Sequence, residues 1–573
     1  MLAGLCCILS LSPYTARMAS PDTWTLGDAT DRIKVPTWLK LHRAFYEGDH
    51  LHGGSTVIHA GEFASSSLPG WIAPMPHPSD PLYQHNYDGI VRGFVSSNKT
   101  AEVVNRHKAG VVGRQPSRGF ESKEPIPEGK EMSPENLRLK QVVDAWMAER
   151  WETEGMHTSL QGAIAALLYS GRQPARLHLP RGFLVKGDKE GEYTIPKVPL
   201  QDMVKMIRLT YPAPENCTVY VDPDTFEEIG IFSYERDGEK RAEITWVDRA
   251  TGFTHLRQIG ENGTINEVRY DFGGHLPMFE MRRAPLVTQQ IIRNNMALNL
   301  ALSTVARNVW SAQARERYFL NAEAPGKDAI VDGEKVFKPE PMQIGDGTAN
   351  FLNGSPILNK DTGEIVGYTT PSVHVEDAIE VKPSKDAVDV YAWEILSEAR
   401  QLHAVMGADA TASAISRIVA RVEFMGSLTE TKPEADKCLE WQADTRLCMA
   451  EAFSGGREGQ RAPHPFSTYL RANVECKLDP GPITPEERVA LKELVKDGIY
   501  TKKTALILMG TEDASEELAR MDVETRTERI FNLLERSRDL GIDPYAVLTL
   551  LGGVPPEEAR ALARGDVVTG VTQ

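Results

Sequence analysis

The sequence predicts a mixed protein of the α+β class that is mainly helical, and two patterns lead to that expectation. Between about residues 174 and 277, apolar and polar residues alternate and turn signals recur, which is typical of antiparallel strands. On both sides of this segment, apolar residues recur at spacings of three and four, which is typical of helices. Since the chain has 573 residues, several structural units are expected.

Residues 31–285 are expected to form the first large unit, in which helices precede the antiparallel module. The run Ser133-Pro134-Glu135 predicts a helix start, because Ser is favoured at the N-cap and Pro at the first helical position. Within the module, the runs Thr218–Val221, Ile229–Phe232 and Glu243–Trp246 alternate, and turn signals such as Asp237-Gly238 separate them. We expect residues 1–30, which precede this unit, to be a flexible leader.

Two long helices are expected over residues 286–313 and 385–407. The first carries an apolar stripe at Val287, Ile291, Leu298 and Leu302, and the second at Val388, Tyr391, Ile395 and Leu402. Neither stripe is wide enough for a helix that is buried all round. Such helices need neighbours, which identical copies in a ring would supply. Residues 314–384, between the helices, are too many for a simple connection and predict a small inserted module with short strands.

The remaining chain is expected to be helical. Residues 408–413 are small and polar, which predicts an exposed loop, followed by one helix from Ala414 to Leu428 and another from Pro433 to Phe453. Residues 481–573 are expected to form a separate helical module. It begins at Thr484, where an N-cap, a Pro and a Glu make a capping box, and its third helix is expected from Ser515 to Leu540.

The charge balance limits the function classes. The formal net charge of −16 argues against a protein that grips nucleic acid tightly, because phosphate neutralisation needs clustered Lys and Arg. An acidic surface is compatible with a conduit that repels a moving polyanion, and equally with charge that only maintains solubility. No segment approaches 18 uninterrupted apolar residues, so we expect no membrane span.

The sequence offers no recognisable catalytic motif. The phosphate loop GxxxxGK[ST], the GxGxxG fingerprint, the GxSxG elbow and the HExxH zinc helix are all missing. The six cysteines form no CxxC pair and have no zinc-like spacing to histidines. Acidic pairs such as Asp222/Asp224 lie where carboxylates act as turn formers and caps. We therefore predict no catalytic residue, no metal site and no cofactor.

The order of these parts, together with three local motifs, resembles the portal proteins of tailed bacteriophages. The strongest match runs from Ile483-Thr484-Pro485-Glu486-Glu487 through Asp497-Gly498-Ile499-Tyr500-Thr501 to Asp513, Glu517 and Glu524, which is similar to the family's C-terminal pattern. Phe45-Tyr46-Glu47-Gly48 is similar to its Tyr-Tyr-x-Gly, and Gly274-His275-Leu276-Pro277 to its Gly-x-Ile-Pro. The resemblance spans about residues 37–540, and its specificity lies in the order of short motifs.

The resemblance implies a wing (31–285), a two-helix stem (286–313 and 385–407) and an inserted clip (314–384). A tunnel loop with long helices returning to the wing (408–480) and a helical crown (481–573) would complete the subunit. It implies a ring, dodecameric in family terms, at one capsid vertex of the virion and assembled in the host cytoplasm. Expected partners are the terminase motor, the major capsid or scaffold protein, the head-to-tail adaptor, and double-stranded DNA passing non-specifically; no membrane is expected.

On this interpretation, particular residues would face DNA or neighbouring subunits. Asp409, Thr411 and Ser413 would lie near the narrowest point of the channel, and Arg293 and Arg307 in the stem. The two stem stripes would pack between subunits. In this chain Ser413 is followed by Ala414, where many portals have Ser-Gly, so the end of the loop departs from the family pattern.

Two other interpretations remain. In the first, the chain is another phage structural protein, such as a minor head protein, which shares the virion location without forming a closed ring. In the second, the chain is a multidomain hydrolase or nuclease with dispersed carboxylates. This interpretation predicts a monomer or small oligomer with metal-dependent activity.

Overall fold

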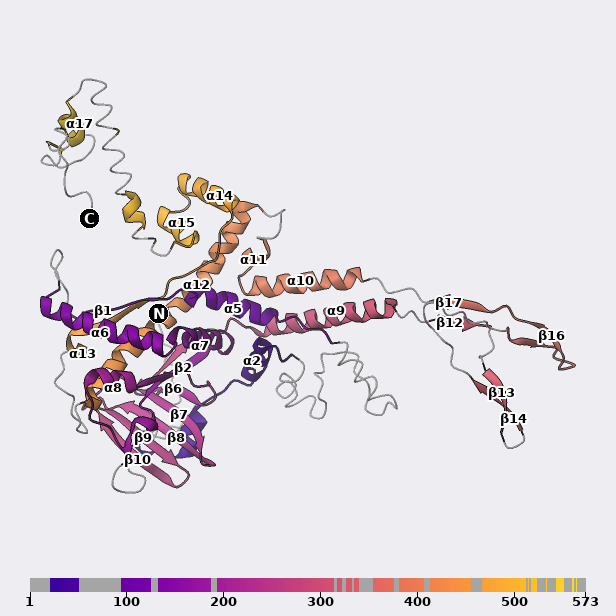
Figure 1. The fold of residues 1–573 in the computed structure, drawn as a ribbon, viewed down its shortest axis with the longest axis horizontal. Coiled ribbons are helices and arrows are strands. Elements are labelled where there is room, and N and C mark those ends of the chain that lie inside the picture. Colours follow the sequence, from indigo (N-terminus) through magenta and orange to yellow (C-terminus); the bar gives the residue numbers. More distant parts are fainter. Residues whose placement is uncertain are drawn as a thin grey trace, which may run out of the picture.

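The fold is seen in a computed structural model, which describes most of the chain. The described residues are 21–50, 94–124, 132–186, 193–313, 317–321, 326–331, 334–339, 354–375, 381–406, 413–454 and 466–511, with short pieces between 514 and 563. The protein is mixed α and β, with more residues in helices than in strands. Figure 1 shows a broad body from which two helices, α9 (Gln289–Gln313) and α10 (Lys382–Glu398), project towards a set of short strands.

A five-stranded antiparallel sheet forms one part of the body, as the alternating pattern predicted. Its order is β10-β9-β8-β7-β6, and every neighbouring pair is antiparallel. A second antiparallel sheet has the order β11-β2-β5. The strands are β2 (Arg172–His178), β5 (Arg208–Thr210), β6 (Cys217–Val221), β7 (Glu228–Arg236), β8 (Glu239–Val247), β9 (Thr254–Gly260), β10 (Gly263–Tyr270) and β11 (Met278–Arg282).

The N-terminal segment departs from the expectation of a flexible leader over residues 1–30. The short helix η1 (Pro21–Thr23) and helix α1 (Leu26–Arg32) pack on the five-stranded sheet. Trp24 is only 2% exposed there, and the guanidinium of Arg32 lies 3.9 Å from its ring centre. The folded body therefore begins by residue 21, because Trp24 and Ala29 complete the apolar face of the sheet; residues 1–20 lie outside the described part.

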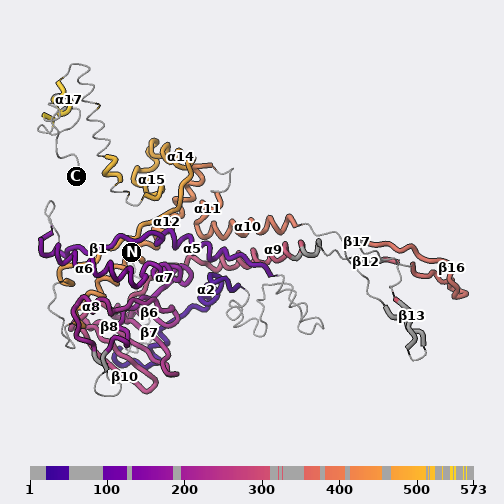
Figure 2. The backbone as a smooth tube through the Cα atoms, viewed as in Figure 1, coloured from indigo at the N-terminus to yellow at the C-terminus, as the bar shows by residue number. Residues whose placement is uncertain are grey.

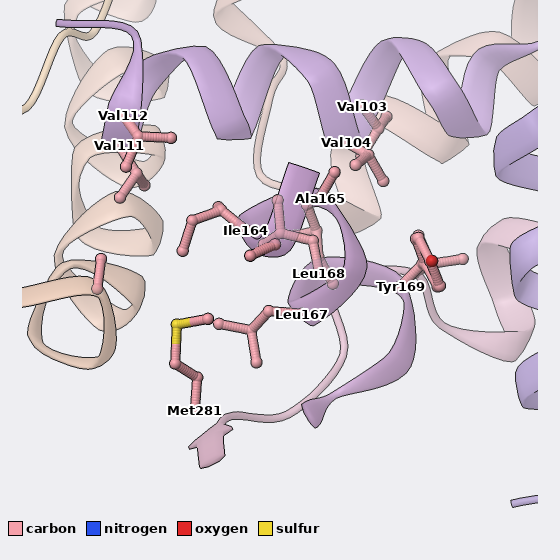
Figure 3. Packing of buried hydrophobic residues seen from close by; sticks show 14 of the residues in the cluster. Val103, Val104, Val111, Val112, Ile164, Ala165, Leu167, Leu168, Tyr169 and Met281 are labelled. Atoms are coloured by element: carbon pink, nitrogen blue, oxygen red, sulfur yellow. The ribbon is translucent and has the colours of Figure 1, made fainter. Parts of the chain in front are cut away.

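Helices α2 (Leu39–Glu47), α5 (Lys99–Val112), α6 (Pro134–Thr153) and α7 (Met156–Ser170) build the main core. Figure 3 shows Val103 and Val104 of α5 close to Ile164 of α7, with Met281 of β11 on the other side. Ser133 caps α6 as expected, since its hydroxyl accepts from the N–H of Asn136 at 3.2 Å. The smaller elements nearby are η2 (Arg181–Phe183), β3 (Val185–Lys186), β4 (Tyr193–Thr194) and α8 (Leu200–Met206).

One continuous helix, α12 (Ala414–Ser454), replaces the two helices expected on either side of Pro433. Proline removes a backbone donor and usually ends or kinks a helix. Here Leu428 and Ala435, on either side of the proline, are both fully buried in the main core. The prediction of a break is wrong because packing on both sides holds the backbone helical across the proline.

The helix expected over residues 385–407 is two helices, α10 and α11 (His403–Met406). Helix α10 begins at Lys382, three residues earlier than expected, since Pro383 fits within the first turn. Helix α10 ends at Glu398 with Ala399 as its C-cap, after which Arg400 adopts a left-handed backbone with φ 56°. The side chain of Gln401 is fully buried and donates to the carbonyl of Val103 at 2.8 Å, so a contact with α5 fixes the break.

The C-terminal part contains the capping box predicted at Thr484. The Thr484 hydroxyl accepts from the N–H of Glu487 at 3.3 Å, and the carboxylate of Glu487 accepts from the N–H of Thr484 at 2.8 Å. Arg421 of α12 donates to the carbonyls of Pro480 and Pro482, which attaches this module to the long helix. The third helix expected from Ser515 to Leu540 lies mostly outside the described residues. The elements are α13 (Phe466–Tyr469), β18 (Leu470–Glu475), paired with β1 (Ser117–Ser122), α14 (Pro485–Lys496), α15 (Lys502–Leu508) and α17 (Pro544–Leu550).

Candidate functional site

The most distinctive feature of the molecule is the projection made by α9 and α10. Figures 1 and 2 show α9 leaving the body and α10 returning beside it, with short strands at the far end. At a rise of 1.5 Å per residue, the 25 residues of α9 span about 38 Å. The projection therefore carries its tip well away from the body.

The apolar stripes predicted for these helices are used mainly within one chain. Val287, Ile291, Leu298 and Ile395 are at most 1% exposed and belong to the main core. These four side chains cannot meet a neighbouring copy, so the prediction of packing between subunits is wrong for them; the body itself supplies the neighbours that the stripes need. Leu302, Val388, Tyr391 and Leu402 are partly buried against the same core, and a role for them between subunits stays a prediction.

A polar seam on α9, which the sequence analysis missed, attaches the root of the projection. Asn295, Asn299 and Ser303 follow one another at four-residue spacing and are almost fully buried. Asn299 Oδ1 accepts from the N–H of Ser97 at 2.9 Å, and Ser303 Oγ accepts from the N–H of Val95 at 2.9 Å. Asn295 Nδ2 donates to the carbonyl of Ser97 at 2.9 Å. The signal in the sequence is the Asn-x₃-Asn-x₃-Ser spacing inside an apolar stripe.

The outer side of the projection leaves large apolar side chains in solvent. On α10, Val390 is 56% exposed and Trp393 is 45% exposed, and Val309 on α9 is 47% exposed. Val390 and Trp393 are three residues apart, which places them close together on one helical face. An exposed tryptophan on a helix that already packs on its other side is a feature of protein interfaces.

Two of the five predicted channel residues have described side chains. Arg293 is exposed on α9. Ser413 is exposed and caps α12, since its hydroxyl accepts from the N–H of Ser416 at 3.1 Å. Asp409 and Thr411 lie outside the described residues, and so does the side chain of Arg307. The structure thus brings none of the five together in a described site, and their contact with DNA stays a prediction.

In the residues that the structure describes, the tip of the projection contains three antiparallel pairs of strands, as the inserted module was expected to contain short strands. β12 pairs with β17, β13 with β14, and β15 with β16. Two-stranded pairs of this kind are only marginally stable alone in water. The strands are β12 (Arg317–Leu320), β13 (Gly326–Val331), β14 (Glu334–Pro339), β15 (Pro356–Leu358), β16 (Ile365–Tyr368) and β17 (Ser372–Val375).

A buried ion network joins the end of α6 to α12 and β5. The carboxylate of Glu154 lies 2.9 Å from Arg446 Nη2 and 3.0 Å from Arg208 Nη1, and it also contacts Arg150. Burial alone would raise the pKa of Glu154, but the charges of Arg446 and Arg150 outweigh it and lower the pKa. Each arginine is held by one shared carboxylate, so this network serves to connect elements of the body.

A second buried polar group lies where α5 crosses α12. His107 is fully buried, and its Nε2 lies 2.8 Å from the Thr431 hydroxyl, which Arg283 also contacts. Burial, together with the nearby charge of Arg283, lowers the pKa of His107 to about 3. His107 is therefore neutral at neutral pH and acts as a hydrogen-bonding part of the core.

Features of small-molecule chemistry are sparse in the part of the chain that the structure describes. A cavity of about 100 Å³ beside α6 is lined mainly by apolar side chains, including Phe120, Met147 and Trp151, and is smaller than the roughly 300 Å³ of pockets for drug-sized ligands. A larger depression of about 510 Å³ on α6 is wide open to solvent, whereas ligand pockets bury most of the ligand surface. Within the described ranges, no group of three or more His, Cys, Asp or Glu residues is arranged to hold a metal ion. Nor does any described helix have the length and apolar character needed to cross a membrane.

No protein-family model matches the chain, and no curated protein matches it in sequence.

Proposed function

We propose that this chain is a portal protein of a tailed bacteriophage, one copy of a ring that surrounds the channel for DNA packaging and ejection. The observation that carries the proposal is the order of parts. A helix leaves the body, an inserted strand module follows, and a second helix returns; a helix of 41 residues, α12, then runs into the body, from which β18 leads back to a separate helical module. This is the order of stem, clip, stem, tunnel loop and crown that the sequence motifs resemble.

Exposed apolar surface on the projection supports an assembly of several chains. Trp393 and Val390 are exposed on α10, and further apolar side chains are exposed at the tip. Soluble monomers seldom keep large contiguous apolar patches in water, and such patches usually mark protein interfaces. Both sites lie on the part of the molecule that leaves the body, where a neighbouring copy would approach.

The proposed role is mechanical and structural. The ring would dock the terminase motor during packaging and later hold the adaptor and tail, and it would contact the capsid or scaffold protein around its rim. With a net charge of −16 per copy, its contact with DNA would be weak and independent of sequence, because tight binding needs clustered Lys and Arg.

Negative-stain electron microscopy of the purified full chain tests the proposal. Closed rings with a central hole and a protruding stalk are the expected result. Another phage structural protein would give particles without a closed ring. A protein that stays monomeric at high concentration and cleaves DNA or another polymer in the presence of a divalent metal would overturn the proposal in favour of an enzyme.

A further inference from the structure

The ion network around Glu154 contains more positive than negative charge. Its single carboxylate faces three guanidinium groups, which belong to Arg150, Arg208 and Arg446. These residues come from the end of α6, from β5 and from α12, all of which lie in the body, away from the projection (Figure 1). Within the part of the chain that the structure describes, two of the three positive charges therefore have no matching carboxylate in the network.

Nearby cations outside the network are already paired. Lys205 of α8 lies 2.8 Å from the carboxylate of Glu149, and Arg176 of β2 lies 2.6 Å from that of Glu243. Each of these pairs is neutral, so the pairs neither add to the excess charge nor remove it. The excess of positive charge thus belongs to the three arginines that share Glu154.

Two of these arginines are shut off from water. The side chain of Arg446 is fully buried, and that of Arg150 is 7% exposed. Burial lowers the pKa of Arg446, the carboxylate of Glu154 raises it, and the charges of Arg150 and Arg208 lower it further. A buried charge is costly unless it is paired and hydrogen-bonded, and here the neighbouring guanidinium groups repel one another. A second anion beside Glu154 would offset this repulsion.

The buried arginines also keep N–H groups without an acceptor. Neither Nε of Arg446 nor Nε of Arg150 has a hydrogen-bond partner among the described residues. Nη1 of Arg446 lies 4.0 Å from the thioether sulfur of Met156, which is a weak acceptor. Buried polar groups are almost always hydrogen-bonded, and an exception calls for an explanation such as an ordered water or ion. These N–H groups are therefore available to the oxygen atoms of a ligand.

Arg208 connects the network to solvent. Its side chain is 39% exposed, while its Nη1 lies 3.0 Å from the carboxylate of Glu154. On the neighbouring strand β2, His178 pairs with Arg208, and its Nδ1 is buried without a partner. Burial and the charge of Arg176 lower the pKa of His178 to about 4, so the ring is neutral at neutral pH and can donate one hydrogen bond. A ligand that approaches past Arg208 meets donors from both strands.

We infer that the cluster of Arg150, Arg208 and Arg446 binds a doubly charged phosphate group, either as free phosphate or as the monoester group of a larger molecule. A guanidinium group donates two parallel hydrogen bonds to phosphate oxygens. A phosphate dianion matches the two positive charges that Glu154 leaves, whereas a carboxylate matches one. A bound phosphate would join α6, β5 and α12. This site goes beyond the proposed portal role and does not depend on the ring.

Equilibrium dialysis of the full chain against radiolabelled inorganic phosphate tests the inference. At mildly alkaline pH, where phosphate is mostly doubly charged, and with NaCl holding the ionic strength constant, we expect saturable binding of one phosphate per chain at millimolar concentration or below. Arg208→Gln should weaken binding about tenfold or more, because it removes a hydrogen bond to a charged group. The variant should fold, since Glu154 keeps Arg150 and Arg446 as partners.

Lys205→Gln is the matched control. It removes the same charge from the neighbouring helix α8, where Lys205 is paired with Glu149, and should change the affinity for phosphate by less than about twofold because salt screens exposed charges. An equal loss in both variants would mean that the general positive potential holds the anion, and would overturn the assignment to the three arginines.

Competition separates the two sources of phosphate. Phosphoserine that displaces labelled phosphate better than unlabelled phosphate does would assign the site to a monoester on a larger molecule, and phosphoserine that competes no better would assign it to free phosphate. Sulfate, which is also a dianion, should compete as well. Absence of saturable binding, or binding that Arg208→Gln leaves unchanged, would refute the site and assign the buried N–H groups to ordered water. Electron microscopy of the rings decides the proposed function separately.

Discussion

Three loops of the chain share one backbone hydrogen-bond pattern, but only two of them have glycine at the fifth position. In the loops 222–227, 248–253 and 359–364, the first N–H donates to the sixth carbonyl and the fifth N–H to the first carbonyl, at distances of 2.7 to 2.9 Å. The fifth position is left-handed in each: Gly252 has φ 73°, Gly363 has φ 70°, and Phe226 has φ 56°. A residue with a Cβ is disfavoured there by about 1–2 kcal/mol. Phe226 is also 75% exposed, so burial returns little of that cost.

Replacing Phe226 by Gly or Asn should therefore stabilise the body. Glycine removes the backbone strain but loses more entropy on folding, so we expect a net gain of roughly 0.5–1 kcal/mol. Urea unfolding of the dissociated chain measures it. Gly252→Ala, where nothing lies within 4 Å of the added Cβ, is the control and should cost about 1 kcal/mol. If Phe226→Gly lowers stability, the aromatic ring contributes a contact that outweighs the strain.

The charge network around Glu154 predicts a loss of stability in acid. Its pKa is lower in the folded than in the unfolded state, where 4.5 is the ordinary value. The contribution is therefore complete above the unfolded-state pKa and is lost as the pH falls through the folded-state pKa. Glu154→Gln should remove this part of the acid dependence and cost about 3–5 kcal/mol at neutral pH, because Arg446 stays buried without its carboxylate.

Urea midpoints measured from neutral pH down to about pH 3 would show the effect of Glu154. The control is Glu149→Gln, which breaks the more exposed pair with Lys205 and should cost no more than about 1 kcal/mol. An equal acid sensitivity in wild type and Glu154→Gln would mean that other carboxylates carry the pH dependence of the body.

At the scale of single elements, the sequence predicted those helix ends and turns whose determinants are local. Ser133 and Thr484 cap their helices as expected, because an N-cap depends on side chains within three residues of it. The break at Gln401 was not predictable, since it depends on a hydrogen bond to α5, almost 300 residues away in the sequence. The buried seam at Asn295 and Asn299 was not predictable for the same reason, because its partners, such as Ser97 and Thr100, lie about 200 residues earlier in the sequence.

Helix α12 leads to a prediction about Pro433, which the sequence analysis took for a helix start. Proline inside a helix costs about 3 kcal/mol through the missing N–H and the clash with the preceding turn. Pro433 is exposed, so Pro433→Ala should stabilise the chain by about 1–3 kcal/mol. Lys437→Ala, one turn further on an exposed position, is the control and should stay within about 0.5 kcal/mol of wild type. A destabilised Pro433→Ala would mean that the core beside Thr431 needs a bend at the proline.

At the scale of the whole molecule, only part of the candidate site could be predicted from the sequence. The two helices and the strand-containing insert between them were predictable, because periodicity and segment length mark them. The side of each helix that faces the body was not predictable. A stripe of apolar residues has the same pattern whether its neighbour belongs to the same chain or to another chain. Ile291 and Ile395 are buried within the chain, and Trp393 and Val366 are the ones left exposed.

The charge of the whole molecule predicts how a ring should respond to salt. Each copy carries a net charge of −16, so neighbouring copies repel one another, and salt screens that repulsion as the Debye length falls from about 10 Å at 0.1 M to about 3 Å at 1 M. The apolar contacts proposed on α10 and at the tip are not weakened by salt. The protein concentration needed for assembly, measured by sedimentation velocity, should therefore decrease as NaCl is raised from about 0.05 M to about 0.5 M. Val366→Glu, which adds one negative charge per copy, should show a steeper dependence. Rings that dissociate as salt is added would mean that ion pairs between copies dominate, and that the apolar surface of the tip has another partner.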